Sequence, residues 1–178
     1  MSKDIRFKFS ANKSYAAIRL MLSHVQNSDL HTILKSCYFG DIEHLNAFNR
    51  PIFGATYRAM KFGPVPLEIY EMTKSDPIWL GELGIDNYPW RLNGFHLEKT
   101  SDSIVDTSSM SESDLDCIKI GFEKSRSMTF TARTAATHGK DWQAANLGLM
   151  RYEDMLADGP DKSAKVAYLK EAAPHIRL

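Results

Sequence analysis

Residues 35–66 read KSCYFGDIEHLNAFNRPIFGATYRAMKFGPVP, and this stretch predicts a helix, a helix stop and a strand in succession. Apolar residues recur every three or four positions and predict an amphipathic helix over 29–48. Ser28 has a side chain suited to cap the start of this helix. Arg50-Pro51 ends it, because a residue before proline is pushed out of the helical region.

The second half of the stretch predicts extended structure followed by a reversal of the chain. The aromatic content of residues 55–62 favours a strand. Residues 63–66, Gly-Pro-Val-Pro, predict a turn. Pro66 suits the first turn of a helix, so a short helix is expected over 66–74.

Outside this stretch the pattern is again mainly helical. Residues 111–114, Ser-Glu-Ser-Asp, resemble a capping box that starts a helix. Residues 75–93 contain two glycines and the pairs Asp76-Pro77 and Tyr88-Pro89, which predicts a loop or a short irregular helix. The other predicted helices cover residues 12–26 (with Asn12 as N-cap), 112–126, 129–138, 140–147, 150–157 and 162–173.

Two further segments predict a small amount of sheet. Residues 95–99 and 103–106 are expected to pair as a hairpin across a polar turn, and to join the 55–62 strand in one sheet. The predicted fold class is therefore mostly α (α+β by strict count). It is a compact multi-helix domain with a small antiparallel sheet.

Length and charge exclude several classes of protein. The chain has 178 residues, with 22 Lys and Arg against 22 Asp and Glu, which predicts one domain without net charge. The charge balance excludes whole-surface attraction to nucleic acid or anionic lipid. No apolar run approaches the length of a membrane span. Charges at the N-terminus argue against a signal peptide, and two cysteines fit a reducing compartment. A cytoplasmic protein is expected.

One carboxylate lies on the apolar side of the predicted 29–48 helix. At 100° per residue, Asp41 falls inside the apolar arc and His44 lies at its edge. One interpretation is an Asp–His pair for catalysis or metal binding. The favoured interpretation is a buried structural acid that accepts hydrogen bonds from a neighbouring element, because buried charge must be paired or protonated.

Other candidate sites are weaker. His31, Cys37 and His44 do not converge on one side of the helix, so no metal site and no cofactor are expected. His138 beside Gly139 suits a helix end, with Trp142 as a core anchor. A site with His138 as general base is the alternative. No phosphate-binding, dinucleotide, nucleophile-elbow or zinc-protease motif is present.

A winged-helix interpretation is also open, since a helical body plus a hairpin can place one helix in the major groove. A wing normally carries basic residues. The predicted 95–106 hairpin instead carries three acids against one lysine and one histidine. Nucleic-acid binding is therefore not expected as the main activity.

Residues 38–70 resemble the Panacea antitoxin domain, also called SocA-like or GepA-like, almost continuously. Residues 111–142 resemble the later helices of that family more weakly, with its Thr-His…Trp signature. The core of the resemblance covers residues 28–146 of a single domain, 1–178, and residues 148–178 form a C-terminal helical extension. The positions of this sequence that carry the family pattern are Asp41, His44, Gly54, Tyr57, Lys61, Gly63, Pro64, His138 and Trp142.

The resemblance implies a non-enzymatic antitoxin, encoded beside a toxin that it neutralises by direct binding. One type of member is a proteolytic adaptor that delivers its toxin to an AAA+ protease. Under this interpretation Asp41 and His44 are polar residues that define the fold, hydrogen-bonded near Tyr57 or near residues 137–142. Gly54 and the Gly63-Pro64 pair set the turns on either side of the strand.

Aromatic residues outside the predicted helices are the candidates for partner binding, because Trp and Tyr are favoured interface anchors. They are Phe7, Phe9, Trp79, Tyr88 and Trp90. The alternative is that the two tryptophans simply cover the sheet. The competing functions are the adaptor, a DNA-binding autoregulator and a small hydrolase that uses Asp41, His44 and His138.

Overall fold

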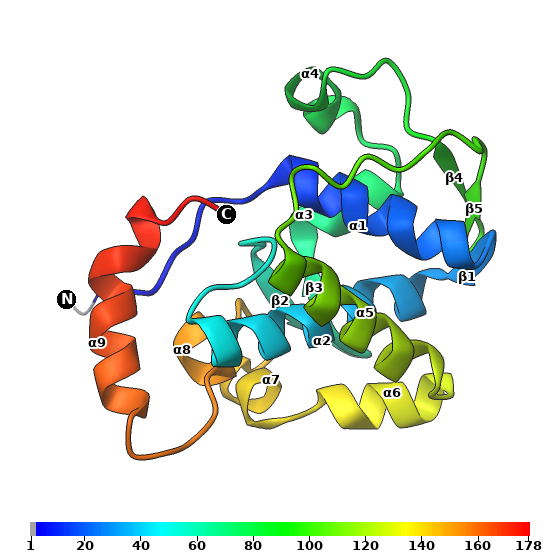
Figure 1. The fold of residues 1–178 in the computed structure, drawn as a ribbon. Helices are drawn as coiled ribbons and strands as arrows, with labels where there is room; N and C mark the ends of the chain where they lie inside the picture. The colour runs from blue at the N-terminus through cyan, green and yellow to red at the C-terminus, as the bar shows by residue number, and fades with distance from the viewer. Residues whose placement is uncertain (1–2) are drawn as a thin grey trace.

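A computed structural model describes residues 3–178, so the first two residues of the N-terminal segment lie outside the description. The fold is mostly helical, with 53% of residues in helices and two small antiparallel sheets, which confirms the predicted class (Figure 1). The α-helices are α1 (Ala11–His24), α2 (Leu30–Phe48), α3 (Leu67–Thr73), α4 (Leu80–Leu83), α5 (Glu112–Arg126), α6 (Phe130–Thr137), α7 (Lys140–Ala145), α8 (Tyr152–Met155) and α9 (Lys162–Ala172). Short 3-10 turns cover Pro77–Trp79 and Ala173–His175.

Helix α2 is the centre of the molecule and spans Leu30–Phe48. The prediction that Ser28 caps this helix is wrong. Ser28 lies in a strand, and the Asp29 side chain caps the helix instead by accepting a 2.8 Å hydrogen bond from Thr32 N. The helix ends at Asn49, which has a left-handed φ of 56°. Asparagine tolerates that conformation better than most residues.

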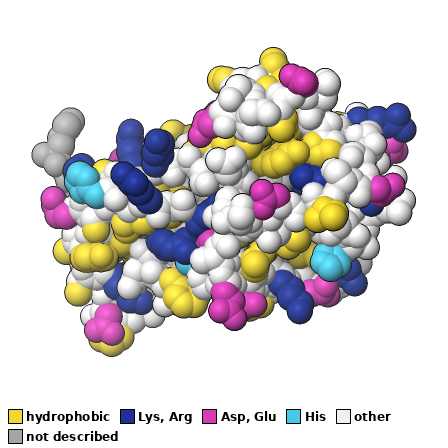
Figure 2. Space-filling view, turned by 45° about the horizontal axis from the view of Figure 1, so that its top comes forward, with side chains coloured by type: hydrophobic (Ala, Val, Ile, Leu, Met, Phe, Trp, Pro, Cys, Tyr) yellow, Lys and Arg dark blue, Asp and Glu magenta, His cyan; other side chains and the backbone are white. Residues whose placement is uncertain are grey.

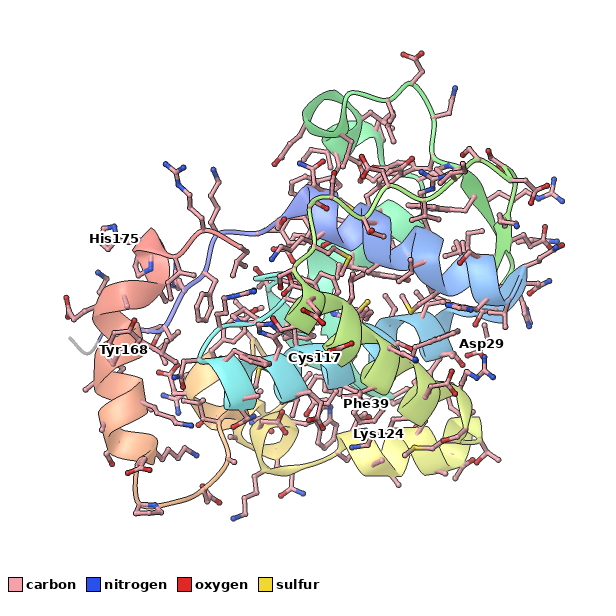
Figure 3. All side chains as sticks on the ribbon, viewed as in Figure 1. Asp29, Phe39, Cys117, Lys124, Tyr168 and His175 are labelled. Carbon is pink, nitrogen blue, oxygen red and sulfur yellow. The ribbon has the colours of Figure 1, made fainter. Side chains whose placement is uncertain are left out.

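Helices α2 and α5 pack backbone to backbone. A Cβ on Gly121 of α5 would lie 2.6 Å from Gly40 N of α2, so α5 has no room for a side chain there, and a Cβ on Gly40 would be tight at 3.3 Å from Cys117 O. In Figure 1, α5 lies in front of α2, and the β2–β3 hairpin lies behind it. Figure 3 shows Cys117 of α5 above α2, with Lys124 further along α5, where its Nζ lies 4.5 Å from the Phe39 ring centre.

Strands β2 (Tyr57–Met60) and β3 (Gly63–Pro66) form an antiparallel hairpin. The strand predicted at 55–62 is confirmed in its central residues. The turn predicted at 63–66 is wrong, because those residues pair with β2 and the chain reverses at residues 61–62. Prolines in β3 are tolerated because an edge strand does not need every N–H for the ladder. Gly63 adopts a φ of 104°, which favours glycine.

The second sheet has the order β1 (Asn27–Asp29), β5 (His96–Lys99) and β4 (Trp90–Asn93). The expected pairing of 95–99 with 103–106 is therefore wrong, and so is the expected single sheet with residues 55–62. A two-residue turn with Gly94 at φ 60° joins β4 to β5. This short hairpin turn forms in place of the longer polar turn expected between residues 99 and 103. Residues 103–104 are instead held by Arg19 of α1, whose guanidinium donates to both carbonyls.

The remaining helix predictions agree with the structure to within a few residues at their ends. The predicted 112–126 helix is confirmed, and so is its capping box between Ser111 and Asp114. Helix α1 begins one residue earlier than expected, because Ser10 rather than Asn12 is its N-cap. Helix α9 lies beside the N-terminal segment at one side of the molecule (Figure 1).

Candidate functional site

Asp41 lies at the contact between α2 and the chain that leads into β2, and its side chain is fully buried. Oδ1 accepts hydrogen bonds from Ile52 N at 2.7 Å and from Phe53 N at 3.2 Å. Oδ2 accepts one from the Tyr57 hydroxyl at 2.8 Å. All three donors are neutral, so this carboxylate fixes the turn after α2 without a counter-ion.

Burial dominates the titration of Asp41. Loss of hydration raises the pKa of Asp41 to about 7, although the hydrogen bonds from Tyr57, Ile52 and Phe53 favour the charged form. A carboxyl group with such a pKa changes its charge within the physiological range. It is nevertheless enclosed, with no exposed surface from which to reach a substrate.

His44 does not pair with Asp41 but belongs to a second polar cluster. Its Nδ1 donates to the Arg50 carbonyl at 2.7 Å, so in the neutral ring Nε2 accepts from the Ser113 hydroxyl at 2.9 Å. Burial lowers the pKa of His44 despite the bond to that carbonyl. Its Nε2 also lies 3.2 Å from Asp114 Oδ1.

Asp114 is the centre of this cluster, although the sequence pattern predicts only a helix-capping role for it. Its carboxylate lies 2.6 Å from Lys13 Nζ and 3.0 Å from Arg50 Nη1, and it has no exposed surface. Burial alone would raise the pKa of Asp114. Hydrogen bonds from Lys13 and from Ser111 N outweigh that effect and hold the pKa below its usual value. One carboxylate thus ties α1, α5 and the end of α2 together.

His138 and Trp142 meet at the corner between α6 and α7. Their rings stack with centres 3.8 Å apart and an interplanar angle of 13°. His138 is the C-cap residue of α6, and its Nε2 is buried without a hydrogen-bond partner in the described residues. Trp142 Nε1 donates to the Met60 carbonyl at 2.9 Å, which attaches this corner to β2.

The three residues of the hydrolase interpretation therefore lie in three different settings. Asp41 is held by Tyr57, His44 by the Asp114 cluster, and His138 by stacking on Trp142. No hydrogen bond joins any two of them within residues 3–178. The arrangement supports structural roles for these groups rather than a shared reaction centre.

Lys35 is a further buried group to which the sequence analysis gave no role. Its Nζ donates to the Pro64 carbonyl at 2.6 Å, and only 1% of the residue is exposed. Burial lowers the pKa of Lys35 to about 7, and the charge of Arg133 adds to this effect. A Cβ on Gly63 would lie 2.9 Å from Lys35 Cε, so glycine is needed there for space as well as for φ. Gly54, at φ 68°, would meet Lys8 O in the same way.

The candidate partner-binding aromatics differ in exposure. Tyr88 and Trp90 are 8% and 3% exposed, so the expectation of a free surface at these two residues is wrong. The Tyr88 hydroxyl donates to Asp76 O and Trp90 Nε1 donates to Met72 O, which satisfies both polar tips inside the protein. Their rings stack on each other with centres 5.0 Å apart.

Phe7, Phe9 and Trp79 are half-buried. Phe7 packs edge-on against Tyr152 with ring centres 5.0 Å apart, and Phe9 lies 4.9 Å from Trp79. Part of each ring remains accessible. Figure 2 shows one face of the molecule, where hydrophobic side chains alternate with charged groups of both signs, so no single-sign field covers it.

The large hydrophobic side chains that are most exposed lie elsewhere. They are Phe48, Phe62, Ile78, Phe95, Ile104, Ile120, Phe130, Leu147, Leu149 and Tyr168. Of these, only Ile78 lies next to a partner-binding candidate, Trp79. Exposure of a loop residue depends on what packs over it, and the local pattern does not contain that information.

A family model described as "Antitoxin SocA-like, Panacea domain" matches residues 33–143, from the first turn of α2 into α7. The chain belongs to this family. The matched region of the Panacea domain contains Asp41, Asp114, the β2–β3 hairpin and the His138–Trp142 corner. No curated protein and no solved structure matches the chain.

Within residues 3–178, no three His, Cys, Asp or Glu side chains are grouped as a metal site would require. In the same range, no helix combines the length and the apolar character needed to cross a membrane.

Proposed function

We propose that this Panacea protein is an antitoxin that neutralises a protein toxin, encoded beside it, by direct binding. The observation that carries the proposal is the family match over residues 33–143. The burial of Asp41 and His44 supports it, because the groups that an enzyme would use are engaged in holding the fold. The protein acts without catalysis and without a cofactor, in the cytoplasm, as one domain with residues 148–178 as a helical extension.

The toxin contacts include accessible aromatic groups at the N-terminal segment. Phe7, Phe9 and Trp79 are the members of the original candidate set that retain exposed ring surface. Half-buried aromatics on a supported backbone are suited to an interface, because little side-chain entropy is lost on binding.

The experiment is co-expression of this chain with the neighbouring reading frame, scored first for growth and then for co-purification. Rescue of growth together with a stable complex is the expected result. Rescue that yields no complex and depends on a cellular AAA+ protease would identify the proteolytic adaptor instead. If no neighbouring product is toxic, the antitoxin proposal is wrong.

A further inference from the structure

A short extended segment after α7 adds a third strand-like element to the β2–β3 hairpin. Ala59 N donates to Gly148 O and Met150 N donates to Tyr57 O, both at 2.9 Å, and Arg58 lies opposite Leu149. Side chains opposite each other in an antiparallel pair point to the same face. Tyr57 and Ala59 are buried, so Arg58 and Leu149 belong to the outer face of this ribbon.

This outer face is apolar and exposed. Leu149 is 60% exposed, Leu147 is 58% exposed, and Phe62 in the turn of the hairpin is 47% exposed. The Phe62 ring contacts Phe130 at the start of α6, with ring centres 5.2 Å apart, and Phe130 is also 47% exposed. We call the set Arg58, Lys61, Phe62, Phe130, Leu147 and Leu149 the ribbon face. Two pairs of exposed apolar side chains, Leu147 with Leu149 and Phe62 with Phe130, thus lie along the ribbon and at its turn. Large exposed apolar patches are typical of interaction sites.

The backbone at one edge of the ribbon face is left-handed at the end of α7 and leaves Leu149 without backbone partners among the described residues. Asn146 and Leu147 have φ values of 46° and 62°, a left-handed conformation that is unusual for leucine. Because the Leu147 side chain is exposed, packing in the isolated protein does not explain it. Leu149 is the non-hydrogen-bonded member of its pair, so its N–H and C=O point away from β2. Neither group has a hydrogen-bond partner within residues 3–178.

The charges around the ribbon face are positive and uncompensated. Within the described residues, neither Arg58 nor Lys61 forms an ion pair. Glu68, an acid next to the hairpin, is already engaged. Its carboxylate accepts hydrogen bonds from Thr56 N at 2.8 Å and from the Thr56 hydroxyl at 2.7 Å. A partner that supplies acids beside apolar side chains would complement this surface.

We infer that the ribbon face binds an extended segment of the toxin that carries acidic and apolar side chains. The segment pairs its backbone with the free edge at Leu149. Its apolar side chains lie on Leu147, Leu149 and Phe62, and its acids meet Arg58 and Lys61. This inference rests on the proposed antitoxin function, since the toxin is the occupant.

The test uses the full chain with the toxic neighbouring product. The double variant Arg58→Glu/Leu149→Asp reverses one charge and removes one apolar contact. The matched control is Lys119→Glu/Ile120→Asp on α5, where both residues are exposed and lie across α2 from the hairpin (Figure 1). The ribbon-face variant is expected to lose growth rescue and to bind at least about tenfold more weakly. The control is expected to behave as wild type, and circular dichroism melting establishes that both variants fold.

Each other result has a defined meaning. If the ribbon-face variant folds and rescues growth as well as wild type, the inference is wrong while the antitoxin function stands. If Phe9→Ala/Trp79→Ala abolishes binding while the ribbon-face variant binds as tightly as wild type, the inference is wrong and the toxin docks at Phe9 and Trp79. If the double variant does not fold, the single turn variant Lys61→Glu replaces it, with the same expected loss.

A second measurement does not depend on the toxin. A phage library of short random peptides is panned against the immobilised wild-type chain and against Arg58→Glu/Leu149→Asp. Enrichment of acidic, leucine- or phenylalanine-containing peptides on wild type alone supports the ribbon face as a binding site for such segments, and this result does not depend on whether a neighbour is toxic. Enrichment of no such peptides, or equal enrichment on both proteins, overturns it.

Discussion

Asp41 and Asp114 are both fully buried carboxylates, but their surroundings differ in charge. Asp41 accepts hydrogen bonds from three neutral donors, whereas Asp114 contacts the cations of Lys13 and Arg50. The pKa of Asp41 is accordingly raised to about 7, and that of Asp114 is held below its usual value. The same residue type thus shows opposite shifts, because hydrogen bonds from neutral groups compensate burial less than adjacent cations do.

The largest effect is expected for Asp114→Ala. The substitution leaves the buried Lys13 ammonium without its partner and removes the capping acid of α5. Breaking a buried ion pair from one side destabilises a protein by about 3–5 kcal/mol. Urea unfolding of the variant measures this. The matched control is Asp116→Ala, an exposed acid on the same helix, which is expected to change stability little. A loss for Asp114→Ala no larger than that of the control would contradict the role of Asp114.

The next effect is expected for Asp41→Ala. Two backbone N–H groups and the Tyr57 hydroxyl lose their acceptor in a site that water does not reach. Unsatisfied buried donors cost about 1–3 kcal/mol each, and partial relaxation limits the total to about 2–4 kcal/mol. Asp41→Asn, which keeps the volume and one acceptor oxygen, should lose distinctly less in the same urea titration. Equal losses for the two variants would show that hydrogen bonding is not the reason.

The pH dependence sharpens the comparison between the two carboxylates. The folded pKa of Asp41 is above the unfolded value, so the folded state holds the extra proton and stability falls as pH rises from about 4 to about 7. The slope from one such group is at most about 1.4 kcal/mol per pH unit. For Asp114 the folded pKa is lowered, so its contribution is present above the unfolded pKa and is lost as pH falls through the folded pKa.

Unfolding measured across this pH range in wild type and Asp41→Asn isolates the first group, because His44 and Asp114 are common to both proteins. The free-energy difference between the two is expected to move in favour of Asp41→Asn as pH rises. A difference that is flat with pH would mean that Asp41 titrates normally in the folded state.

The comparison also shows what a sequence can and cannot predict. The place of Asp41 on the apolar side of α2, the 112–126 helix and its capping box all follow from local spacing. The partners of Asp114 do not, because Lys13 and Arg50 come from distant parts of the chain. The same limit explains why residues 95–99 were given the wrong strand partner. Strand β1 has only three residues and no periodic signal, so its pairing depends on long-range packing.

Surfaces are harder still to predict than buried partners. Tyr88 and Trp90 are residue types that favour interfaces, but both are buried and stack on each other inside the protein. Leucine is usually buried in a protein core, but Leu147 and Leu149 are both exposed. Only the path of the chain after α7, with its two left-handed residues, decides that outcome.

The smallest effect is expected for Tyr57→Phe, which removes one of the three donors to Asp41 and leaves the ring in place. The lost hydrogen bond should destabilise the protein by about 1 kcal/mol, since the carboxylate keeps both backbone donors. Because that hydroxyl favours the charged form of Asp41, its removal also raises the pKa of the carboxyl further. The decline of stability with pH should therefore continue to a higher pH than in wild type. An unchanged pH profile would show that the Tyr57 hydroxyl does not contribute to the pKa of Asp41.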